Sequence, residues 1–357
     1  MSNILYIGPY KQNDEWGLNS KAFLGLLQTY YGSNVVSRPI WFTSEDRMHE
    51  GFHLLQCEQN KLNSFDVIIQ HGLPNRLSYN GNFKKNIAVA KVDSRIKNTN
   101  WVDNLNLFDK IIVFSQYEKL MLEESNVVKP IMAFDFPPIF LSSNIQDFNL
   151  NFGKNTVFYT KGSLNEKDGI KEIMMAYLLS FSKLDNVLLL IVTDDKEAIE
   201  QEINKQKQLL GLYNPSNNDY YPNIGIINPL SDVILNYLHE KADYYIHTFY
   251  DSVPTQDLLK AIIFNHTPIV LDTCANIFDK EYDFIVSSIK APCLLKNRPV
   301  SQICIGYNDC QCPNIKSLQN KMTLAYTSKN SKDKSIINTV INDIFTKPLE
   351  YIKHVCD

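Results

Sequence analysis

Residues 246–271 read IHTFYDSVPTQDLLKAIIFNHTPIVL. An apolar run that ends at Phe249 predicts a strand, and a short polar loop follows it. The chain from Thr255 to about residue 264 has the pattern of a helix, and Pro268 opens another apolar run that predicts a strand. A helix that starts at the carboxyl end of a parallel strand presents free N–H groups and the positive end of its dipole. This helix N-terminus is therefore suited to a phosphate group.

Length and composition limit the possible classes of protein. The chain has 357 residues, more than one compact core usually holds, so we expect two domains. Hydrophobic residues make up 44% of the chain and charged residues 21%, and the formal net charge is −4. This balance gives no electrostatic footprint for nucleic acid and no polybasic signal for a membrane surface, which disfavours a DNA-binding function.

The sequence contains no signal for membrane insertion or export. No apolar run reaches about 18 residues, so we expect no transmembrane segment. Residues 1–8 enter a predicted strand directly and lack the charged and apolar regions of a targeting leader. We therefore expect a cytoplasmic protein.

The seven cysteines do not form a recognisable metal motif. Four of them lie close together near the C-terminal end: Cys293, Cys304, Cys310 and Cys312. The pair Cys310 and Cys312 lacks the two-residue spacer of zinc knuckles, and no second pair or spaced histidine accompanies it. We expect free reduced thiols and no metal site.

The N-terminal half alternates between apolar and amphipathic runs. A polar loop through Trp16 and Gly17 separates the first two, and Asn19 or Ser20 is a plausible N-cap for the helix that follows. Predicted strands are residues 4–7, 35–42, 66–70, 87–92 and 110–114; predicted helices are 22–31, one within 49–60, and 116–125 with Ser115 as its cap. This alternation predicts a parallel sheet wound on both faces.

Gly17 and His71 lie in loops just beyond the carboxyl ends of predicted strands, where ligands approach such sheets. Gly17 has no side chain, so its backbone could come close to a substrate, or it could serve only as a turn. His71 is a candidate hydrogen-bonding or acid–base group near the reacting atoms, or it could simply cap a strand.

The same alternation restarts after residue 154, beyond a proline-broken and polar stretch. Predicted strands are residues 156–160, 187–192, 224–227 and 243–249; predicted helices are 170–181, 196–210, 232–241 and 255–264. A break followed by new βα units indicates a second domain. We place the first domain at residues 1–141 and the second at 142–330.

Several motifs, in the correct order along most of the chain, resemble the retaining glycosyltransferases of the GT-B fold. The first motif matches at Trp101, Asp109, Ser115 and Pro130. The loop 162–169 is similar to the family's Gly-Arg-Leu-x-x-x-Lys-Gly loop, and residues 312–326 are similar to a segment near the family's C-terminus. The resemblance implies two Rossmann-like, doubly wound α/β domains facing a cleft, with a last helix in 331–357 that crosses back to the first domain.

The resemblance also implies that the second domain binds a nucleotide-sugar donor and the first domain the acceptor. In the donor loop, Gly162 and Lys167 match the family, whereas Ser163 replaces an arginine. Lys167 is then the leading contact for the diphosphate, and Lys161 could stand in for the missing arginine. The alternative for both lysines is an ordinary place on the surface.

The family has two glutamates, separated by seven residues, in the region of the opening stretch. The first would fall at Asp251 or Ser252. The second would fall at Asp257 or Lys260, depending on a one-residue slip before Pro268. Asp251 keeps a carboxylate on a shorter arm and is the catalytic candidate. Asp257 could reach a ribose hydroxyl, or it could only favour the helix N-terminus.

The resemblance implies a metal-independent glycosyltransferase that needs no cofactor and moves a sugar, with retention, from a nucleotide-sugar donor to an acceptor hydroxyl. Pro254, Thr255 and Gln256 would complete the donor site. The acceptor could be a glycan, a protein or a modified nucleobase, and the sequence names neither the sugar nor the oligomeric state. The alternatives are a GT-B protein that has lost catalysis and serves in binding or assembly, and an epimerase or phosphorylase on the same scaffold.

Overall fold

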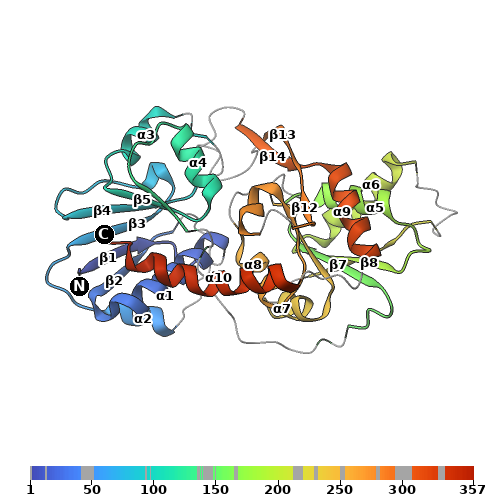
Figure 1. Ribbon diagram of the computed structural model, residues 1–357, viewed down its shortest axis with the longest axis horizontal. Coiled ribbons are helices and arrows are strands. Elements are labelled where there is room, and N and C mark those ends of the chain that lie inside the picture. Colours follow the sequence, from blue (N-terminus) through green and yellow to red (C-terminus); the bar gives the residue numbers. More distant parts are fainter. Residues whose placement is uncertain are drawn as a thin grey trace.

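The computed structural model of the protein describes residues 2–12, 14–41, 52–92, 95–96, 98–134, 137, 139, 148, 150–164, 168–211, 220–228, 232–249, 254–278, 282–293, 308–328 and 334–357. They form two parallel sheets with helices packed around them, arranged along the long axis of the molecule (Figure 1). The predicted fold class of two Rossmann-like α/β domains is confirmed. The predicted domain boundaries, after residues 141 and 330, lie outside the described residues.

Within the described residues, the first domain has a six-stranded sheet in the order β2-β1-β3-β4-β5-β6, and each neighbouring pair is parallel. The strands are β1 (Ile4–Gly8), β2 (Val35–Pro39), β3 (Val67–Gly72), β4 (Lys85–Ala90), β5 (Lys110–Val113) and β6 (Ile131–Ala133). The helices are α1 (Glu15–Tyr31), α2 (Phe52–Gln59), α3 (Thr99–Leu105) and α4 (Gln116–Glu124), with the short 3-10 helices η1 (Gly32–Asn34) and η2 (Pro74–Arg76).

The described part of the second domain repeats this plan with the order β12-β11-β10-β7-β8-β9, again all parallel. Its strands are β7 (Thr156–Lys161), β8 (Val187–Val192), β9 (Asn223–Ile227), β10 (Tyr244–His247), β11 (Ile269–Leu271) and β12 (Ile285–Val286). Its helices are α5 (Ile170–Ser180), α6 (Lys196–Leu209), α7 (Asp232–Lys241), α8 (Gln256–Ile263) and α9 (Ile315–Thr327), with the 3-10 helix η3 (Asp272–Ile277). Strand β10 ends two residues before the predicted end at Phe249.

Each face of the first sheet has its own hydrophobic core. In β4, Ile87 and Val89 belong to one core cluster and Ala88 and Ala90 to the other, because successive side chains of a strand point to opposite faces. Side chains of α1, α2 and α10 complete the first cluster, and side chains of α3 and α4 complete the second. The sheet is therefore covered on both faces, as the alternating pattern predicts.

Helix α1 begins earlier than its sequence pattern predicts. The N-cap is Asp14, whose side chain accepts a hydrogen bond from the N–H of Gly17 at 2.8 Å. The predicted N-caps, Asn19 and Ser20, are wrong, since both residues are buried within the helix. Asp, Asn and Ser are all good capping residues, so residue type alone could not choose among the three places.

Other local predictions are confirmed. Ser115 caps α4, with its Oγ accepting the N–H of Glu118 at 3.0 Å. The Glu118 carboxylate in turn accepts the N–H groups of Val92 and Phe114, both at 2.9 Å. One buried side chain therefore ties together the carboxyl ends of β4 and β5, close to the edge of the sheet where ligands bind in such folds.

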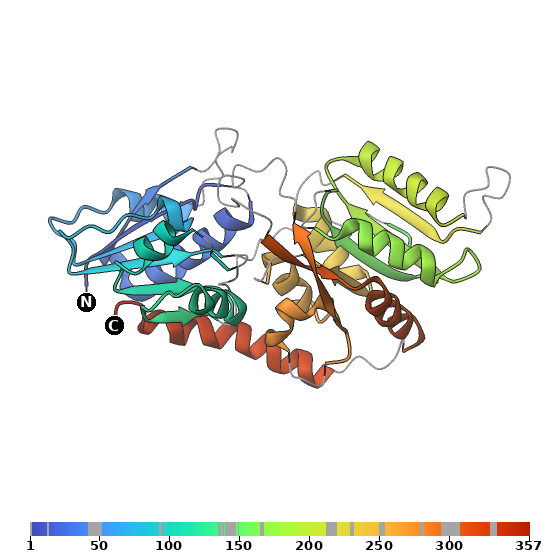
Figure 2. The same cartoon turned by 90° about the horizontal axis from the view of Figure 1, so that it is seen from above.

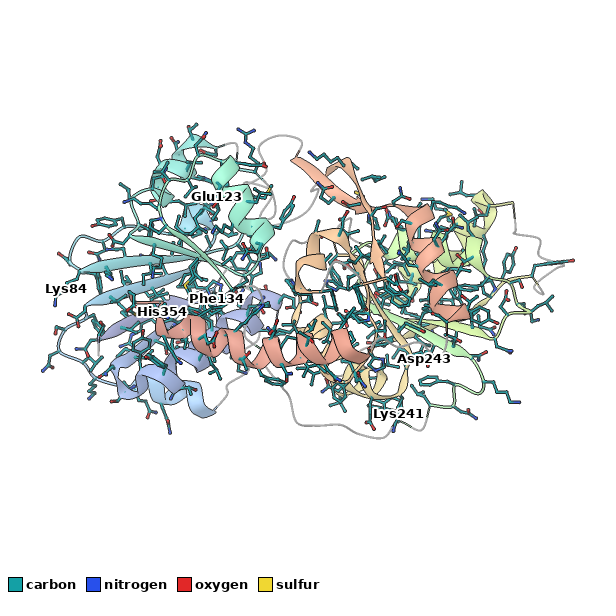
Figure 3. All side chains as sticks on the ribbon, in the orientation of Figure 1. Lys84, Glu123, Phe134, Lys241, Asp243 and His354 are labelled. Carbon is teal, nitrogen blue, oxygen red and sulfur yellow. The ribbon has the colours of Figure 1, made fainter. Side chains whose placement is uncertain are left out.

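Helix α10 (Lys334–Lys353) packs against α1 in the first domain and α8 in the second, as Figures 1 and 2 show. Beyond its end, Lys110 Nζ donates to the carbonyl oxygen of His354 at 2.7 Å. Lys85 Nζ donates to the carbonyl oxygen of Cys356 at 2.8 Å. Figure 3 shows His354 at this end of the chain, beside the first domain. Cations here offset the negative end of the helix dipole.

The sequence pattern did not predict the antiparallel hairpin of β13 (Ser288–Cys293) and β14 (Asn308–Pro313). Its register pairs Ile289 with Cys312 and Ala291 with Cys310. Residues 288–293 read SIKAPC and residues 308–313 read NDCQCP, so polar residues and proline interrupt both strands and neither shows the alternation that indicates a strand. Among the described residues, no group of three or more His, Cys, Asp or Glu side chains is placed to hold a metal ion.

No helix in the described ranges combines the length and the apolar character that crossing a bilayer requires.

The lysine contacts at the end of α10 predict a loss of stability. Lys110→Ala should lower the free energy of unfolding by about 1–2 kcal/mol, because it removes a charge-assisted bond to a helix-end carbonyl. Urea unfolding followed by circular dichroism measures the change. The control is Lys84→Ala, because Lys84 pairs with Asp66 but its side chain is 82% exposed (Figure 3). Equal losses of free energy of unfolding in Lys110→Ala and Lys84→Ala would contradict the role given to the lysine contacts at the end of α10.

Candidate active site

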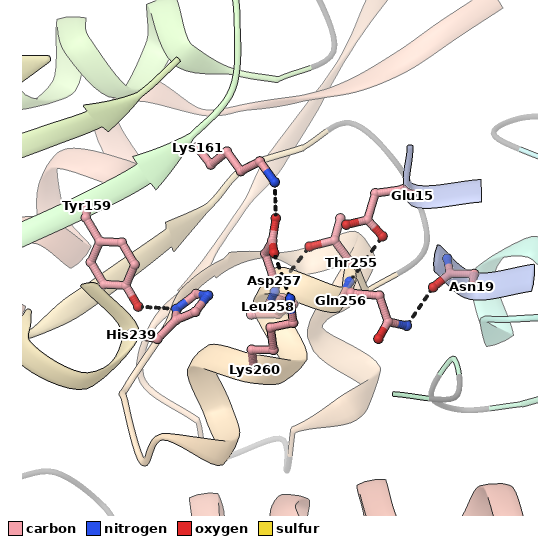
Figure 4. Close-up of polar contacts among 10 residues, drawn as sticks. All are labelled: Glu15, Asn19, Tyr159, Lys161, His239, Thr255, Gln256, Asp257, Leu258 and Lys260. Carbon is pink, nitrogen blue, oxygen red and sulfur yellow. Dashed lines mark hydrogen bonds and ion pairs between the residues drawn. The ribbon is translucent and has the colours of Figure 1, made fainter. Parts of the chain in front are cut away.

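The N-termini of α1 and α8 meet between the two domains (Figure 4). The backbone N–H of Gln256 donates to Glu15 Oε2 at 3.2 Å, and Gln256 Nε2 donates to Asn19 Oδ1 at 2.7 Å. Helix α1 follows the carboxyl end of β1, and α8 follows the carboxyl end of β10. These bonds therefore bring together the carboxyl edges of the two sheets, where ligands bind in open parallel sheets.

Thr255 fixes the start of α8. Its Oγ1 accepts the N–H of Leu258 at 3.2 Å, so Thr255 is the N-cap and the helix starts at Gln256, close to the predicted position. Pro254 and Thr255 are both buried. Of the first-turn N–H groups, that of Leu258 bonds the cap and that of Gln256 bonds Glu15 of the other domain.

Asp257 lies in the first turn of α8 between two lysines. Its Oδ2 accepts a hydrogen bond from Lys161 Nζ at 2.9 Å, and its Oδ1 lies 3.8 Å from Lys260 Nζ. Burial alone would raise the pKa of Asp257, but Lys161 and Lys260 outweigh it and lower this pKa to about 2. Two lysines and one carboxylate leave a net charge of +1, and the Lys161 side chain is 36% exposed. This group therefore favours an anion.

A layer of neutral polar side chains lies beside Asp257, on the side of α7. The hydroxyl of Tyr159 and Nδ1 of His239 are 2.7 Å apart, and both residues are fully buried. Burial lowers the pKa of His239 to about 3, so its imidazole is neutral at pH 7. His239 Nε2 and the hydroxyl of Tyr245 are buried without a hydrogen-bond partner in the described part of the chain. This layer adds polarity near Asp257 without adding charge.

Asp168, just before α5, bonds back to Ser163, just after β7. Its Oδ2 accepts the N–H of Ser163 at 2.7 Å and the hydroxyl of Ser163 at 3.1 Å. Gly169 has a φ of +68°, and a Cβ at that position would lie 2.7 Å from the carbonyl oxygen of Thr248. Glycine alone combines this backbone conformation with this close approach, so Gly169 lies against the end of β10.

Gly17 does not lie in the predicted loop. It is buried in the first turn of α1, and a Cβ there would collide with the backbone carbonyl of Gln12. The missing side chain therefore makes room for the chain's own preceding turn. The sequence pattern could not distinguish this self-contact from close approach to a substrate, since both require glycine.

His71 lies within β3 and not in the loop beyond it. Its Nδ1 is 2.8 Å from the hydroxyl of Tyr6, and burial lowers its pKa to about 3, so the imidazole is neutral at pH 7. Trp16 and Lys91 line a cavity of about 20 Å³ together with His71, which is room for about one water molecule. Lys91 Nζ lies 5.5 Å from the centre of the Trp16 ring.

The structure brings most of the predicted donor-site residues together and leaves two undescribed. Those at the α8 N-terminus are Lys161, Pro254, Thr255, Gln256 and Asp257, and Gly162 and Ser163 directly follow Lys161 along the chain. Lys167 and Asp251 lie outside the described residues. The sequence motifs did not indicate Glu15 and Asn19 as site residues. An acidic pair before an amphipathic run is a helix-start signal that could have located Glu15.

Glu15 is only partly exposed, and its carboxyl is the second shifted acid of the site. Burial raises its pKa, and the neighbouring Asp257 raises it further, against the attraction of Lys161, so that it reaches about 7. The pKa values of Glu15 and Asp257 are therefore shifted in opposite directions within one cluster of charges.

We expect the protein to be most stable at mildly acidic pH. The raised pKa of Glu15 contributes stability that is full below about pH 4 and is lost as pH rises through 7. The lowered pKa of Asp257 contributes stability that is present above about pH 4 and is lost as pH falls through 2. Urea unfolding between pH 4 and 8 should show that the free energy of unfolding falls as pH rises. In Glu15→Gln this fall should be smaller by about 1–2 kcal/mol. An unchanged decline would refute the assignment.

Substitution of Gly169 tests the close approach of this residue to the end of β10. Gly169→Ala should destabilise the protein by about 2 kcal/mol or more, because both the positive φ and the contact with Thr248 oppose a side chain. Gly153→Ala is the matched control: its φ is +61°, but nothing lies within 4 Å of the added Cβ, so only the backbone term of about 1 kcal/mol applies. If both variants lowered the midpoint of thermal unfolding equally, the close contact of Gly169 with Thr248 would be excluded.

Known proteins resemble this chain in structure and not detectably in sequence. No protein-family model and no curated protein matches the sequence. The structure is similar to HepE of Anabaena in complex with UDP and glucose, with a TM-score of 0.57, 11% identity, and coverage of 99% of this chain and 98% of that chain. A glycosyltransferase of Rickettsia africae ESF-5 gives a TM-score of 0.57, 14% identity and the same coverage of 99% and 98%.

TarM of S. aureus, in a complex that contains UDP, is also similar. The TM-score is 0.53 and the identity 12%, over 81% of this chain and 54% of TarM, so the chain spans about half the length of that protein. At these identities the likeness concerns the fold. The protein has the GT-B fold, and the resemblance inferred from the sequence motifs is confirmed at that level.

Proposed function

We propose that the protein is a glycosyltransferase that moves a sugar from a nucleoside-diphosphate sugar to the hydroxyl of an acceptor. The observation that carries the proposal is the meeting of the α8 N-terminus, Lys161 and Asp257 at the facing edges of two Rossmann-like domains. Backbone N–H groups at a helix N-terminus and a lysine ammonium are the groups that bind phosphate oxygens in proteins. The donor phosphates belong at this place.

Proteins of the same fold support this class of ligand. The similar structure of HepE holds UDP and glucose, and that of TarM contains UDP. These ligands belong to those proteins. The proposal for this chain is a nucleoside diphosphate, because that group matches the net positive charge around Lys161.

The proposed reaction breaks the bond between the sugar anomeric carbon and the oxygen of the donor phosphate, and forms a bond from that carbon to the acceptor oxygen. The acceptor hydroxyl gives its proton to an oxygen of the leaving diphosphate. The bonding electrons leave with the diphosphate, so negative charge grows there. Lys161 and the first turn of α8 stabilise this charge, and Asp257 orients Lys161. Because these groups neutralise the leaving group, the proposed mechanism needs no metal ion and no cofactor.

Other elements of the proposal come from the motif resemblance. Lys167 is proposed as a second cation on the diphosphate and Asp251 as the catalytic carboxylate, with retention of configuration. The acceptor is proposed to bind to the first domain. His71 is proposed as a neutral hydrogen-bonding group on that side of the site.

Release of free nucleoside diphosphate from a panel of nucleotide sugars tests the proposal. The wild type should release one diphosphate of the panel, and Lys161→Ala should lower the rate about tenfold or more by removing a cation from the leaving group. Asp257→Asn should also lower the rate, because it releases Lys161 from its 2.9 Å bond.

The control for this assay is Lys84→Ala, which removes an exposed lysine at the far edge of the first domain. It should leave the rate unchanged. If Lys161→Ala retained full activity, the proposed donor site would be wrong. If no nucleotide sugar bound to the wild type, the proposed function would be rejected.

A further inference from the structure

One carboxylate already occupies the N-terminus of α8. Glu15 Oε2 accepts the N–H of Gln256 at 3.2 Å, and Glu15 belongs to the other domain. A carboxylate oxygen and a phosphate oxygen are equivalent partners for a helix N-terminus, since both are anionic hydrogen-bond acceptors. The N–H of Gln256 therefore cannot bind Glu15 and a donor phosphate in the same geometry at the same time.

A second bond supports the first. Asn19 lies one turn after Glu15 on the same face of α1, and its Oδ1 accepts Gln256 Nε2 at 2.7 Å. The Gln256 side chain is fully buried and Asn19 is 9% exposed. Gln256 is thus held by its backbone and its side chain at once, both from the first domain, and this contact excludes water.

The surrounding charges make Glu15 replaceable. Asp257 on α8 repels its carboxylate, whereas Lys161 on β7 and Lys91 after β4 attract it. Lys260 lies behind Asp257, 3.8 Å from its Oδ1. An incoming diphosphate would carry more negative charge than Glu15 and could approach Lys161, whose side chain is the most exposed of the groups around Asp257. The diphosphate is therefore the stronger of the two competing anions.

We propose that Glu15 is an interdomain latch whose carboxylate stands in for a donor phosphate at the N-terminus of α8 and joins the domains until the donor displaces it. The inference rests on the proposed function, because it concerns the donor site. Displacement of Glu15 would free the first turn of α1 from α8, while α10 still packs against both helices. The latch lowers donor affinity, because part of the binding free energy is used to break it.

Titration calorimetry with UDP, GDP and ADP, each added separately, tests the competition. Glu15→Gln keeps the size of the side chain but removes the negative charge. It should bind the recognised diphosphate about five- to tenfold more tightly than the wild type. Glu123→Gln, a change of an exposed carboxylate on α4, should bind like the wild type. Equal or weaker binding by Glu15→Gln would overturn the proposal.

Hydrogen exchange in the absence of nucleotide tests the latch independently of the ligand. The peptide that contains Gln256 should exchange faster in Glu15→Gln, and also in Asn19→Ala, which keeps the Glu15 charge. Unchanged exchange in both variants rejects the latch whatever the titrations give. Faster exchange without diphosphate binding by any form of the protein supports the contact of Glu15 with Gln256 but rejects both its displacement by a donor and the proposed function.

Discussion

The contact between the first turns of α1 and α8 is the interaction on which the arrangement of the two domains depends. Two helix N-termini that face each other bring together the positive ends of two dipoles, which is unfavourable without negative charge between them. Asp14, Glu15 and Asp257 supply three carboxylates at this place. Glu15 bonds directly across the gap to the N–H of Gln256 and so joins the two helix ends.

The C-terminal end of α10 carries the opposite partial charge, and positively charged side chains face it. Helix α10 spans both domains, and the chain that follows it accepts hydrogen bonds from Lys85 and Lys110 at the start of β4 and β5. Carboxylates thus face the helix N-termini between the domains, and lysines face the C-terminal end of the helix that joins them. The contact between α1 and α8 and the end of α10 therefore follow the same electrostatic rule.

Charge and polarity are divided within the site itself. Lys161, Lys260 and Asp257 form a group with a net positive charge, and the buried Tyr159 and His239 beside it are neutral. His71 in the first domain is neutral for the same reason, burial. In the proposed function, the positive charge for the diphosphate comes mainly from Lys161 and the start of α8. The other polar groups can form hydrogen bonds without competing for the anion.

The sequence by itself determined the alternation of strands and helices, the two Rossmann-like domains and the start of α8 at Thr255, because periodicity and capping are local properties. The motifs also indicated Lys161 and Asp257, which the structure joins at 2.9 Å. The sequence pattern placed the start of α1 too late, since several capping residues fit it. The pattern also placed Gly17 in a loop, since a glycine that avoids its own chain and one that approaches a ligand look alike in sequence. Only the tertiary structure decided that Glu15 meets Gln256, because these residues are 241 positions apart and neither shows a local signal of the contact.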